Sequence, residues 1–278
     1  MRFAIGHGTG NDFVVLPDLD GALTLSPSSV RTLCDRRRGI GGDGVLRVVP
    51  TAKVDEVAHL AHQADWFMDY HNADGTIAEM CGNGIRVYAR WLQRCGLAGE
   101  GTVNVATRDG IKYVTLPASV DDDITVDMGP PRIPEMARRV AVESGQYDGV
   151  EIWMGNPHVV VFVDGLDAAG PLTVAPDVEP RFQTNVEFVV DGGDGHLAMR
   201  VHERGSGETQ SCGTGACAAA VATALRHDTS SGRWTVDVPG GRLHVEWTGD
   251  TVYLSGPAVI VADGELDPSW ALQAGFGS

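Results

Sequence analysis

Two cysteines occur in the same local context at distant points of the chain. Cys81 begins Cys-Gly-Asn-Gly, Cys212 begins Cys-Gly-Thr-Gly, and each motif leads into a segment with helical patterning. A thiol at a helix start lies beside unpaired backbone N–H groups and the positive end of the helix dipole, which favour the thiolate. The small glycines let a ligand carboxylate approach the same N–H groups. Each motif therefore predicts a base beside an anion site.

Two such sites together can invert a stereocentre next to a carboxylate. One thiolate removes the proton from one face, and a thiol returns a proton to the other face. N–H donors at both helix starts would stabilise the carbanion-like intermediate, so the scheme needs no cofactor. Only two lysines are present, Lys53 and Lys112, and neither follows a glycine. Their positions exclude a Walker phosphate loop and argue against a pyridoxal Schiff base.

The chain contains an internal duplication. Residues 10–15 read Gly-Asn-Asp-Phe-Val-Val and residues 155–160 read Gly-Asn-Pro-His-Val-Val. Further on, Cys81-Gly-Asn-Gly-Ile-Arg-Val-Tyr-Ala matches Cys212-Gly-Thr-Gly-Ala-Cys-Ala-Ala-Ala. The two pairs keep the same order in each half, and one of them is centred on cysteine, a scarce residue. A repeat with so long a period predicts two related domains rather than a solenoid.

Helical patterning follows each repeated cysteine. From Gly84, apolar residues recur at helical spacing while Arg86 and Arg90 supply a polar side, which predicts a half-buried helix. From Gly215, the residues are apolar on all sides, which predicts a helix enclosed by other structure. A third helix is predicted over residues 28–36.

Short β-branched runs bounded by Gly, Pro or Asp predict strands. They cover residues 45–49, 101–105, 111–116, 124–128, 159–163, 186–190, 197–202, 234–238, 243–247 and 252–254, with a hairpin turn at 238–242. Strands outnumber helices without strict alternation, so the predicted fold class is α+β with two pseudo-symmetric domains.

The domain boundaries follow from the repeat and from a proline-rich segment. Residues 128–134 contain three prolines and are the expected crossing between the domains. We expect an N-terminal half over residues 1–120, which contains Cys81 and which the tail 264–278 can join. The C-terminal half is expected over residues 121–263 and contains Cys212.

Composition narrows the class of protein. The chain has 278 residues, 43% of them hydrophobic, and a formal net charge of -16, which argues against a nucleic-acid partner. No apolar run approaches the roughly 20 residues of a membrane span, and the N-terminus lacks a signal-peptide pattern. We therefore expect a cytoplasmic protein with reduced thiols. No Cys-x-x-Cys pair is present, so no metal site is expected.

Four segments taken together resemble the signature of a known family. They are Gly-Thr-Gly-Asn-Asp-Phe (8–13), Asn-Ala-Asp-Gly (72–75) followed by Glu-Met-Cys-Gly-Asn-Gly-Ile-Arg (79–86), Gly-Asn-Pro-His (155–158), and Glu-Arg-Gly-Ser-Gly-Glu-Thr-Gln-Ser-Cys-Gly-Thr-Gly-Ala-Cys-Ala (203–218). In content and order they are similar to the motifs of diaminopimelate epimerase, from residue 5 to about residue 263.

The resemblance implies a fold and an activity. The family fold has two pseudo-symmetric α+β domains, each with mixed or antiparallel strands wrapped around a central helix, and its active site lies between them. The implied reaction is the cofactor-independent conversion of LL-2,6-diaminopimelate to the meso isomer, in bacterial lysine and peptidoglycan-precursor synthesis. Cys81 and Cys212 are implied as the catalytic pair, and the direction of reaction decides which of them is the base.

Substrate contacts also follow from the resemblance. The reacting carboxylate would be held by backbone at Gly82, Asn83, Gly213 and Thr214. The distal amino-acid end would be held by Asn72, Asn156, Asn185, Glu203 and Arg204, and Asn11 would line the site. Arg204 can grip a carboxylate with its fork while Glu203 complements an ammonium group, as a substrate with charges at both ends requires.

Some features stay open at this point. His158 lies close to the family's site, and its role is undecided. Many family members have Gln where this chain has Gly44, so that substrate contact is expected to be absent or replaced by water. The alternatives are an enzyme like proline racemase or hydroxyproline epimerase, and a thiol-redox binding protein. The sequence does not decide the oligomeric state, with a homodimer as one alternative.

Overall fold

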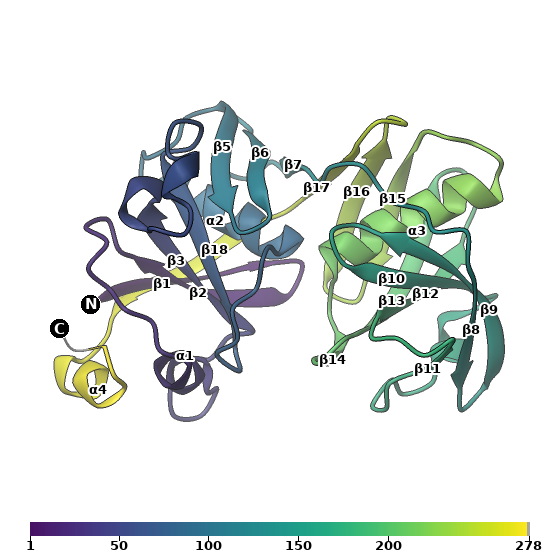
Figure 1. Cartoon of the computed structure of the whole chain (residues 1–278), viewed down its shortest axis with the longest axis horizontal. Helices are drawn as coiled ribbons and strands as arrows, with labels where there is room; N and C mark the ends of the chain where they lie inside the picture. Colours follow the sequence, from purple (N-terminus) through teal and green to yellow (C-terminus); the bar gives the residue numbers. More distant parts are fainter. Residues whose placement is uncertain (277–278) are drawn as a thin grey trace. The chain divides into compact units, whose positions relative to one another are not determined.

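The computed structural model describes residues 1–276, and the chain divides into two compact units (Figure 1). The first unit comprises Met1–Val126 together with the C-terminal segment that starts at Pro257, and the second comprises Asp127–Gly256. The domain boundaries that we expect from the sequence, near residues 120 and 263, concern the two functional halves and stay a prediction. Gly277 and Ser278, the end of the predicted tail, lie outside the described residues.

Strands in the first unit surround one long helix. They pair side by side in the order β18 (Val259–Glu265), β1 (Arg2–Gly8), β2 (Asn11–Pro17), β3 (Gly44–Pro50), β4 (Trp66–Asn72), β5 (Gly101–Thr107), β6 (Gly110–Leu116) and β7 (Ile124–Asp127). The pairs β2/β3 and β4/β5 are parallel, and the others are antiparallel. Helix α2 (Gly82–Arg94) packs against β1, β2, β3, β4, β6 and β18.

The second unit repeats this plan. Its strands pair in the order β8 (Ala137–Val142), β9 (Gly145–Trp153), β10 (Pro157–Phe162), β12 (Asn185–Asp191), β13 (His196–Glu203), β15 (Gly232–Val238), β16 (Gly241–Trp247) and β17 (Val252–Gly256). Short strands β11 (Asp177–Glu179) and β14 (Gly207–Thr209) lie beside β8 and β13. Helix α3 (Gly213–Arg226) packs against β9, β10, β12, β13, β15, β16 and β17.

The order of parallel and antiparallel pairs is the same in both units. In each, the third and fourth strands are parallel, as are the fifth and sixth, and the remaining pairs are antiparallel. A parallel pair cannot be joined by a hairpin, and in both units the long helix lies in the crossover between strands five and six. The repeated cysteines stand at the start of those two crossover helices. The α+β class predicted from the sequence is confirmed.

Most predicted elements are present. Each predicted strand overlaps an observed one, and the turn at 238–242 joins β15 to β16. The enclosure of α3 is confirmed, since residues 215–224 are all buried. The half-buried character predicted for α2 is wrong: Arg86 and Arg90 are buried too. Arg86 donates to Gly82 O and Asn83 Oδ1, and Arg90 donates to Ala258 O, so hydrogen bonds replace the water that their guanidinium groups would otherwise need.

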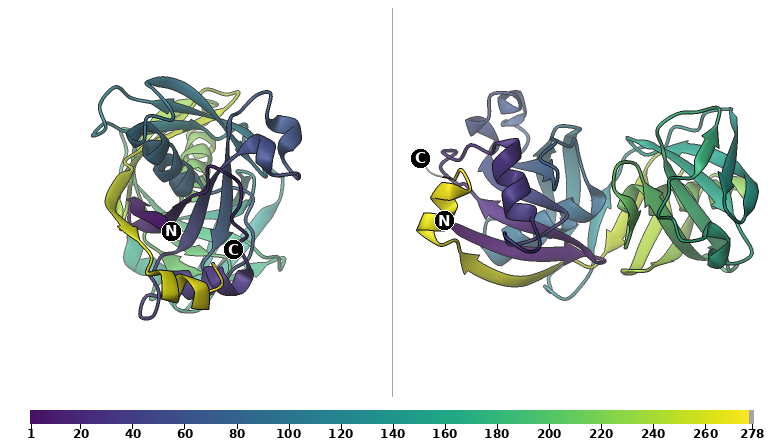
Figure 2. Two further views of the ribbon diagram at one scale, coloured as in Figure 1. Left: turned by 90° about the vertical axis from the view of Figure 1, so that its left-hand side faces the viewer. Right: turned by 90° about the horizontal axis from the view of Figure 1, so that it is seen from below.

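Two smaller helices pack together at one end of the first unit (Figure 2). Helix α1 (Pro27–Cys34) begins at a capping box made by Ser26 and Ser29, and α4 (Pro268–Gln273) begins at Asp267. Val30 and Leu33 share one apolar cluster with Leu266 and Ala271. Short 3-10 helices cover Thr51–Lys53, Ala58–Leu60 and Leu166–Ala169. Within residues 1–276, no helix has the length and apolar character needed to cross a membrane.

Candidate active site

Cys81 caps the N-terminus of α2. Its sulfur accepts a hydrogen bond from the backbone N–H of Gly84 at 3.4 Å, which places the thiol at the positive end of the helix dipole. Gly82 and Asn83, in the first turn, are both buried. A Cβ on Gly84 would come to 3.3 Å from the Cβ of Cys81 and from a methyl of Leu46. A side chain at position 84 would therefore crowd Cys81 and Leu46.

The amide of Asn11, at the start of β2, lies between Cys81 and the carboxylate of Asp43. Its Nδ2 donates to Asp43 Oδ2 at 2.8 Å, while its Oδ1 lies 3.3 Å from Asn83 Nδ2 and 3.8 Å from Cys81 Sγ. Arg36 in turn bridges the carboxylates of Asp43 and Asp12. Because Asp43 can only accept when ionised, it fixes the amide with the oxygen toward the thiol.

Asn72 ends β4 and has both sides of its amide occupied. Tyr70 Oη donates to Asn72 Oδ1 at 2.8 Å, and Asn72 Nδ2 donates to Thr76 Oγ1 at 3.0 Å. Gly44 pairs with Asn72 across the β3/β4 ladder. A Cβ on Gly44 would come to 2.7 Å from the Tyr70 ring and 2.6 Å from His71 O. The Tyr70 ring therefore occupies space that a side chain at position 44 would need.

Cys212 caps the N-terminus of α3, and its surroundings differ from those expected. Burial raises the pKa of the Cys212 thiol well above its usual range, and the carboxyl groups of Glu203 and Glu187 raise it further. A hydrogen bond with Thr214, whose Oγ1 lies 3.5 Å from the sulfur, opposes the shift but does not outweigh it. The backbone N–H of Gly215, at the helix start, does act to lower the pKa of this thiol, but burial and the two acidic groups outweigh it. The net lowering expected from the sequence is therefore wrong.

Three more predicted residues gather around the β13/β14 turn. Burial raises the pKa of Glu203, although hydrogen bonds with Thr209 and with the Cys212 thiol act against the shift. Thr209 Oγ1 lies 2.5 Å from Glu203 Oε1. Asn185 Oδ1 accepts the backbone N–H of Arg204 at 2.8 Å. The Arg204 side chain is exposed, and within residues 1–276 its guanidinium forms no ion pair. It is free to bind an anion.

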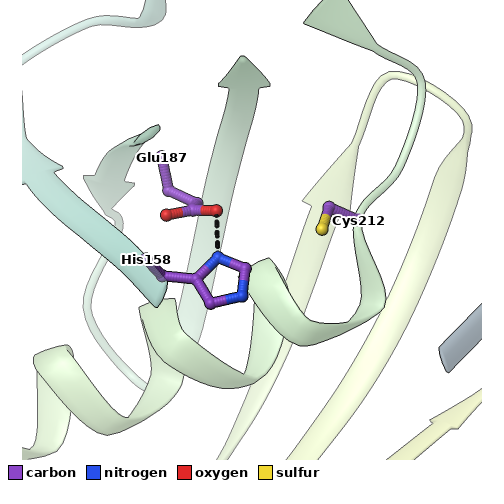
Figure 3. A group of neighbouring side chains, drawn as sticks. All are labelled: His158, Glu187 and Cys212. Carbon is purple, nitrogen blue, oxygen red and sulfur yellow. Dashed lines mark hydrogen bonds and ion pairs between the residues drawn. The ribbon is translucent and has the colours of Figure 1, made fainter. Parts of the chain in front are cut away.

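His158 lies on β10, which packs against α3, and its ring lies between the Glu187 carboxylate and the Asn156 amide. Its Nδ1 is 2.6 Å from Glu187 Oε1, and its Nε2 is 2.9 Å from Asn156 Oδ1. Both the His158 and Glu187 side chains are 0% exposed. Ligand atoms of His158, Glu187 and Cys212 lie within 4.8 Å of one another (Figure 3). Two ligands on one tetrahedral zinc ion are roughly 3.3 Å apart, so the shorter His158–Glu187 contact is the geometry of a hydrogen bond.

The absence of a side chain at Gly215 leaves room for the Glu187 carboxylate. A Cβ on Gly215, in the first turn of α3, would come to 2.7 Å from Glu187 Oε1 and 3.2 Å from the Cβ of Cys212. The second glycine of Cys-Gly-Thr-Gly therefore lets Glu187 reach under the helix start.

Within each unit the structure brings several predicted residues together. Asn11, Cys81 and Asn83 are in contact in the first unit, and Asn72 lies on β4, which β3 separates from the strand of Asn11. Cys212, Thr214 and Glu203 are in contact in the second, as are Asn156 with His158 and Asn185 with Arg204. Asp43 and Glu187 were not predicted from the sequence. Glu187 could have been found, because it is the one charged residue in the apolar run 186–190.

Comparison with known proteins identifies the family. A family model described as diaminopimelate epimerase matches residues 3–134 and 150–261. A diaminopimelate epimerase of Streptomyces coelicolor is 51% identical over 97% of this chain and 96% of that protein. One from Thermobifida fusca is 49% identical over 96% of this chain and 98% of that protein.

Solved structures agree on the fold. A Bacillus anthracis protein of the PhzF family matches with a TM-score of 0.70 and 18% identity, over 96% of this chain and 99% of that one. A hydroxyproline epimerase from Agrobacterium vitis matches with a TM-score of 0.69 and 17% identity, over 100% of this chain and 95% of that one. At such identities the likeness concerns the fold alone. The family model and the near full-length identity to curated relatives go further: this chain belongs to the diaminopimelate epimerase family.

Proposed function

We propose that this protein is an isomerase that interconverts LL- and meso-diaminopimelate without a cofactor, in bacterial lysine and peptidoglycan-precursor synthesis. The observation that carries the proposal is the pair of helix starts, each with a cysteine cap, in a chain 51% identical to a diaminopimelate epimerase. A cytoplasmic location and a homodimer stay predictions from the sequence.

In the proposed reaction, the thiolate of one cysteine takes the α-proton and becomes a thiol. The electron pair left on carbon is delocalised into the adjacent carboxylate, which backbone N–H groups at the helix starts stabilise. The thiol of the other cysteine then gives its proton to the opposite face and becomes a thiolate. The raised pKa of Cys212 supports a resting form in which Cys212 is the thiol and Cys81 is the base. The reverse direction starts from the opposite protonation of the pair.

The remaining predicted residues bind the rest of the substrate in this proposal. Gly82, Asn83, Gly213 and Thr214 would hold the reacting carboxylate. Arg204 would hold the distal carboxylate and Glu203 the distal ammonium, with Asn72, Asn156 and Asn185 as hydrogen-bonding partners. The free guanidinium of Arg204 supports this assignment. The second, charged amino-acid end distinguishes diaminopimelate from proline, which has no such end.

A turnover assay tests the proposal. Reduced protein is incubated with LL-diaminopimelate or with L-proline, and the stereoisomers are separated by chiral chromatography. We expect meso-diaminopimelate to form and proline to stay unchanged. Cys81→Ala and Cys212→Ala should each abolish turnover, while Cys95→Ala, at an exposed cysteine of the same chain, should retain it. Racemisation of proline alone, or activity present only in oxidised protein, would refute the proposal.

A further inference from the structure

The buried contact between Glu187 and His158 has no place in the two-thiol scheme. The two residues come from the parallel strands β10 and β12, where His158 pairs with Asn185 and Val160 pairs with Glu187. Side chains two residues apart on a strand share one face, so His158, Asn185 and Glu187 all project from the same face of these strands. Helix α3 packs against both strands, and Cys212 stands at its start. A charged residue there is costly unless it has a partner.

The partners of the imidazole determine where its protons lie. A carboxylate oxygen and an amide oxygen only accept hydrogen bonds. In the amide orientation of the structure, His158 Nδ1 faces Glu187 Oε1 and its Nε2 faces Asn156 Oδ1, an arrangement in which both ring nitrogens donate. A ring that donates from both nitrogens is an imidazolium, whose charge would balance that of the Glu187 carboxylate. The other oxygen, Glu187 Oε2, is buried and has no hydrogen-bond partner in the residues that the structure describes.

The same contacts decide which way the Asn156 amide points. With Oδ1 held by His158, the Nδ2 group is turned away from the histidine, and across residues 1–276 it has no hydrogen-bond partner. An unpaired NH2 group can donate to an anionic or carbonyl oxygen of a ligand. If His158 were neutral with its proton on Nδ1, Nε2 would accept instead, and the amide would have to present its oxygen to the ligand.

We propose that Glu187 is a positioning residue: it holds His158 as an imidazolium and, through it, fixes the Asn156 amide with its NH2 group toward the substrate. The inference rests on the proposed function only in taking Asn156 as a substrate-binding residue. Glu187 itself touches no substrate. Its effect on Asn156 passes through two hydrogen bonds, which His158 donates to the Glu187 carboxylate and to the Asn156 amide oxygen. This effect is separate from the one that its charge has on the pKa of Cys212.

The first test needs no turnover. Glu187→Gln removes the charge and keeps the shape, and Glu151→Gln is the matched control. Glu151 is also a buried carboxylate of the second unit, but it pairs with Arg138 and lies opposite Val159, on the other face of the sheet from His158. Nitrogen-15 NMR of the histidine rings at pH 7.5 reports the protonation of His158, assigned by its loss in His158→Gln. We expect two protonated nitrogens in the unmodified protein and in Glu151→Gln, and a neutral ring in Glu187→Gln.

The second test uses the kinetics. Glu187→Gln should raise KM for diaminopimelate about tenfold with a smaller effect on kcat, the loss expected for one hydrogen bond to a charged group. In an Asn156→Ala background, the same substitution should add little, because the two residues act in one chain of contacts. A neutral His158 in the unmodified protein, or equal and additive KM effects in both backgrounds, would overturn the inference. If the protein fails to epimerise diaminopimelate at all, the NMR result still decides the role of Glu187.

Discussion

The backbone N–H of Gly84 points to the sulfur of Cys81 at 3.4 Å, at the first turn of α2. Cys212 stands at the equivalent point of α3, but it lies beside the carboxyl groups of Glu203 and Glu187. The two halves therefore share a backbone plan and differ in the charges that surround the sulfur. A reaction that needs one base and one acid fits this difference, because the folded chain favours the thiol at Cys212.

This asymmetry predicts the alkylation behaviour of Cys212. Burial and the two acidic neighbours raise the pKa of its thiol, so in Cys81→Ala protein the alkylation of Cys212 by iodoacetamide should be slow at pH 7 and should rise above pH 9. Glu203→Gln removes one negative charge and should move the rise to lower pH. Peptide mass spectrometry separates Cys212 from the other cysteines. Rapid labelling of Cys212 at pH 7 in Cys81→Ala protein would show that burial and the two carboxyl groups do not raise the pKa of its thiol.

Asp43 is predicted to set the orientation of Asn11. In Asp43→Asn the carboxylate no longer forces the Asn11 amide to donate, so the amide can turn its NH2 group toward Cys81. We expect kcat to fall about tenfold, the cost of one misdirected hydrogen bond to a charged group. Asp20→Asn, at an exposed position of the same unit, is the control and should leave kcat unchanged. An unaltered kcat in Asp43→Asn would show that the orientation of the Asn11 amide does not affect the chemistry of Cys81.

Arg204 should contribute to binding rather than to the chemical step. In the proposed function, Arg204→Ala would remove a bidentate contact with the distal carboxylate that persists throughout the reaction. KM should therefore rise roughly 10- to 100-fold with little change in kcat. Arg233→Ala removes an exposed arginine paired with Glu246 and should leave both constants unchanged. A fall in kcat at constant KM would place Arg204 at the reacting carbon instead.

A buried ion network in the first unit predicts how stability depends on pH. Burial alone would raise the pKa of Asp69, but hydrogen bonds and charge from His71 and Arg108 outweigh it and hold that pKa far below its usual value. A lowered pKa means that Asp69 stabilises the fold above about pH 4 and that this contribution is lost as the pH falls. Asp69→Asn should lower the free energy of unfolding by about 3–5 kcal/mol at pH 7.

Urea denaturation at pH 7 and at pH 3.5 checks this expectation. The difference between Asp69→Asn and the unmodified protein should shrink at the lower pH. Asp65→Asn, at an exposed position just before the same strand, should lie within about 0.5 kcal/mol of the unmodified protein. A difference that is independent of pH would mean that Asp69 acts through packing rather than through its charge.

The sequence was informative where local chemistry decides the structure. The Cys-Gly-x-Gly motifs located both crossover helices, because a cap residue and glycines act within one turn. Strand β4 was missed because Asp69 and His71 interrupt its apolar residues, and both are buried only through partners on other elements, such as Arg47 and Arg108. For the same reason, the burial of Arg86 and Arg90 could not be predicted from helical spacing.

Sequence motifs proposed the residues of the candidate site but not the charges that surround them. Motifs identified Cys212 and Glu203, yet the direction of the Cys212 pKa shift depends on how deeply the thiol is buried and on which carboxyl groups surround it. Glu187 reaches the site from a strand 25 residues earlier in the chain than Cys212. Such neighbours follow from the pairing of β10 with β12, and a single sequence does not specify that pairing.

The fate of the α-proton tests the two-thiol reaction most directly. LL-diaminopimelate is incubated with reduced protein in deuterated water, and α-deuterium is measured early in the reaction in both the remaining substrate and the meso product. If one thiol removes the proton and the other supplies a new one, the meso product carries deuterium while the remaining substrate carries almost none. Deuterium entering substrate and product at equal rates, or a product that keeps its original proton, would contradict inversion by two groups on opposite faces.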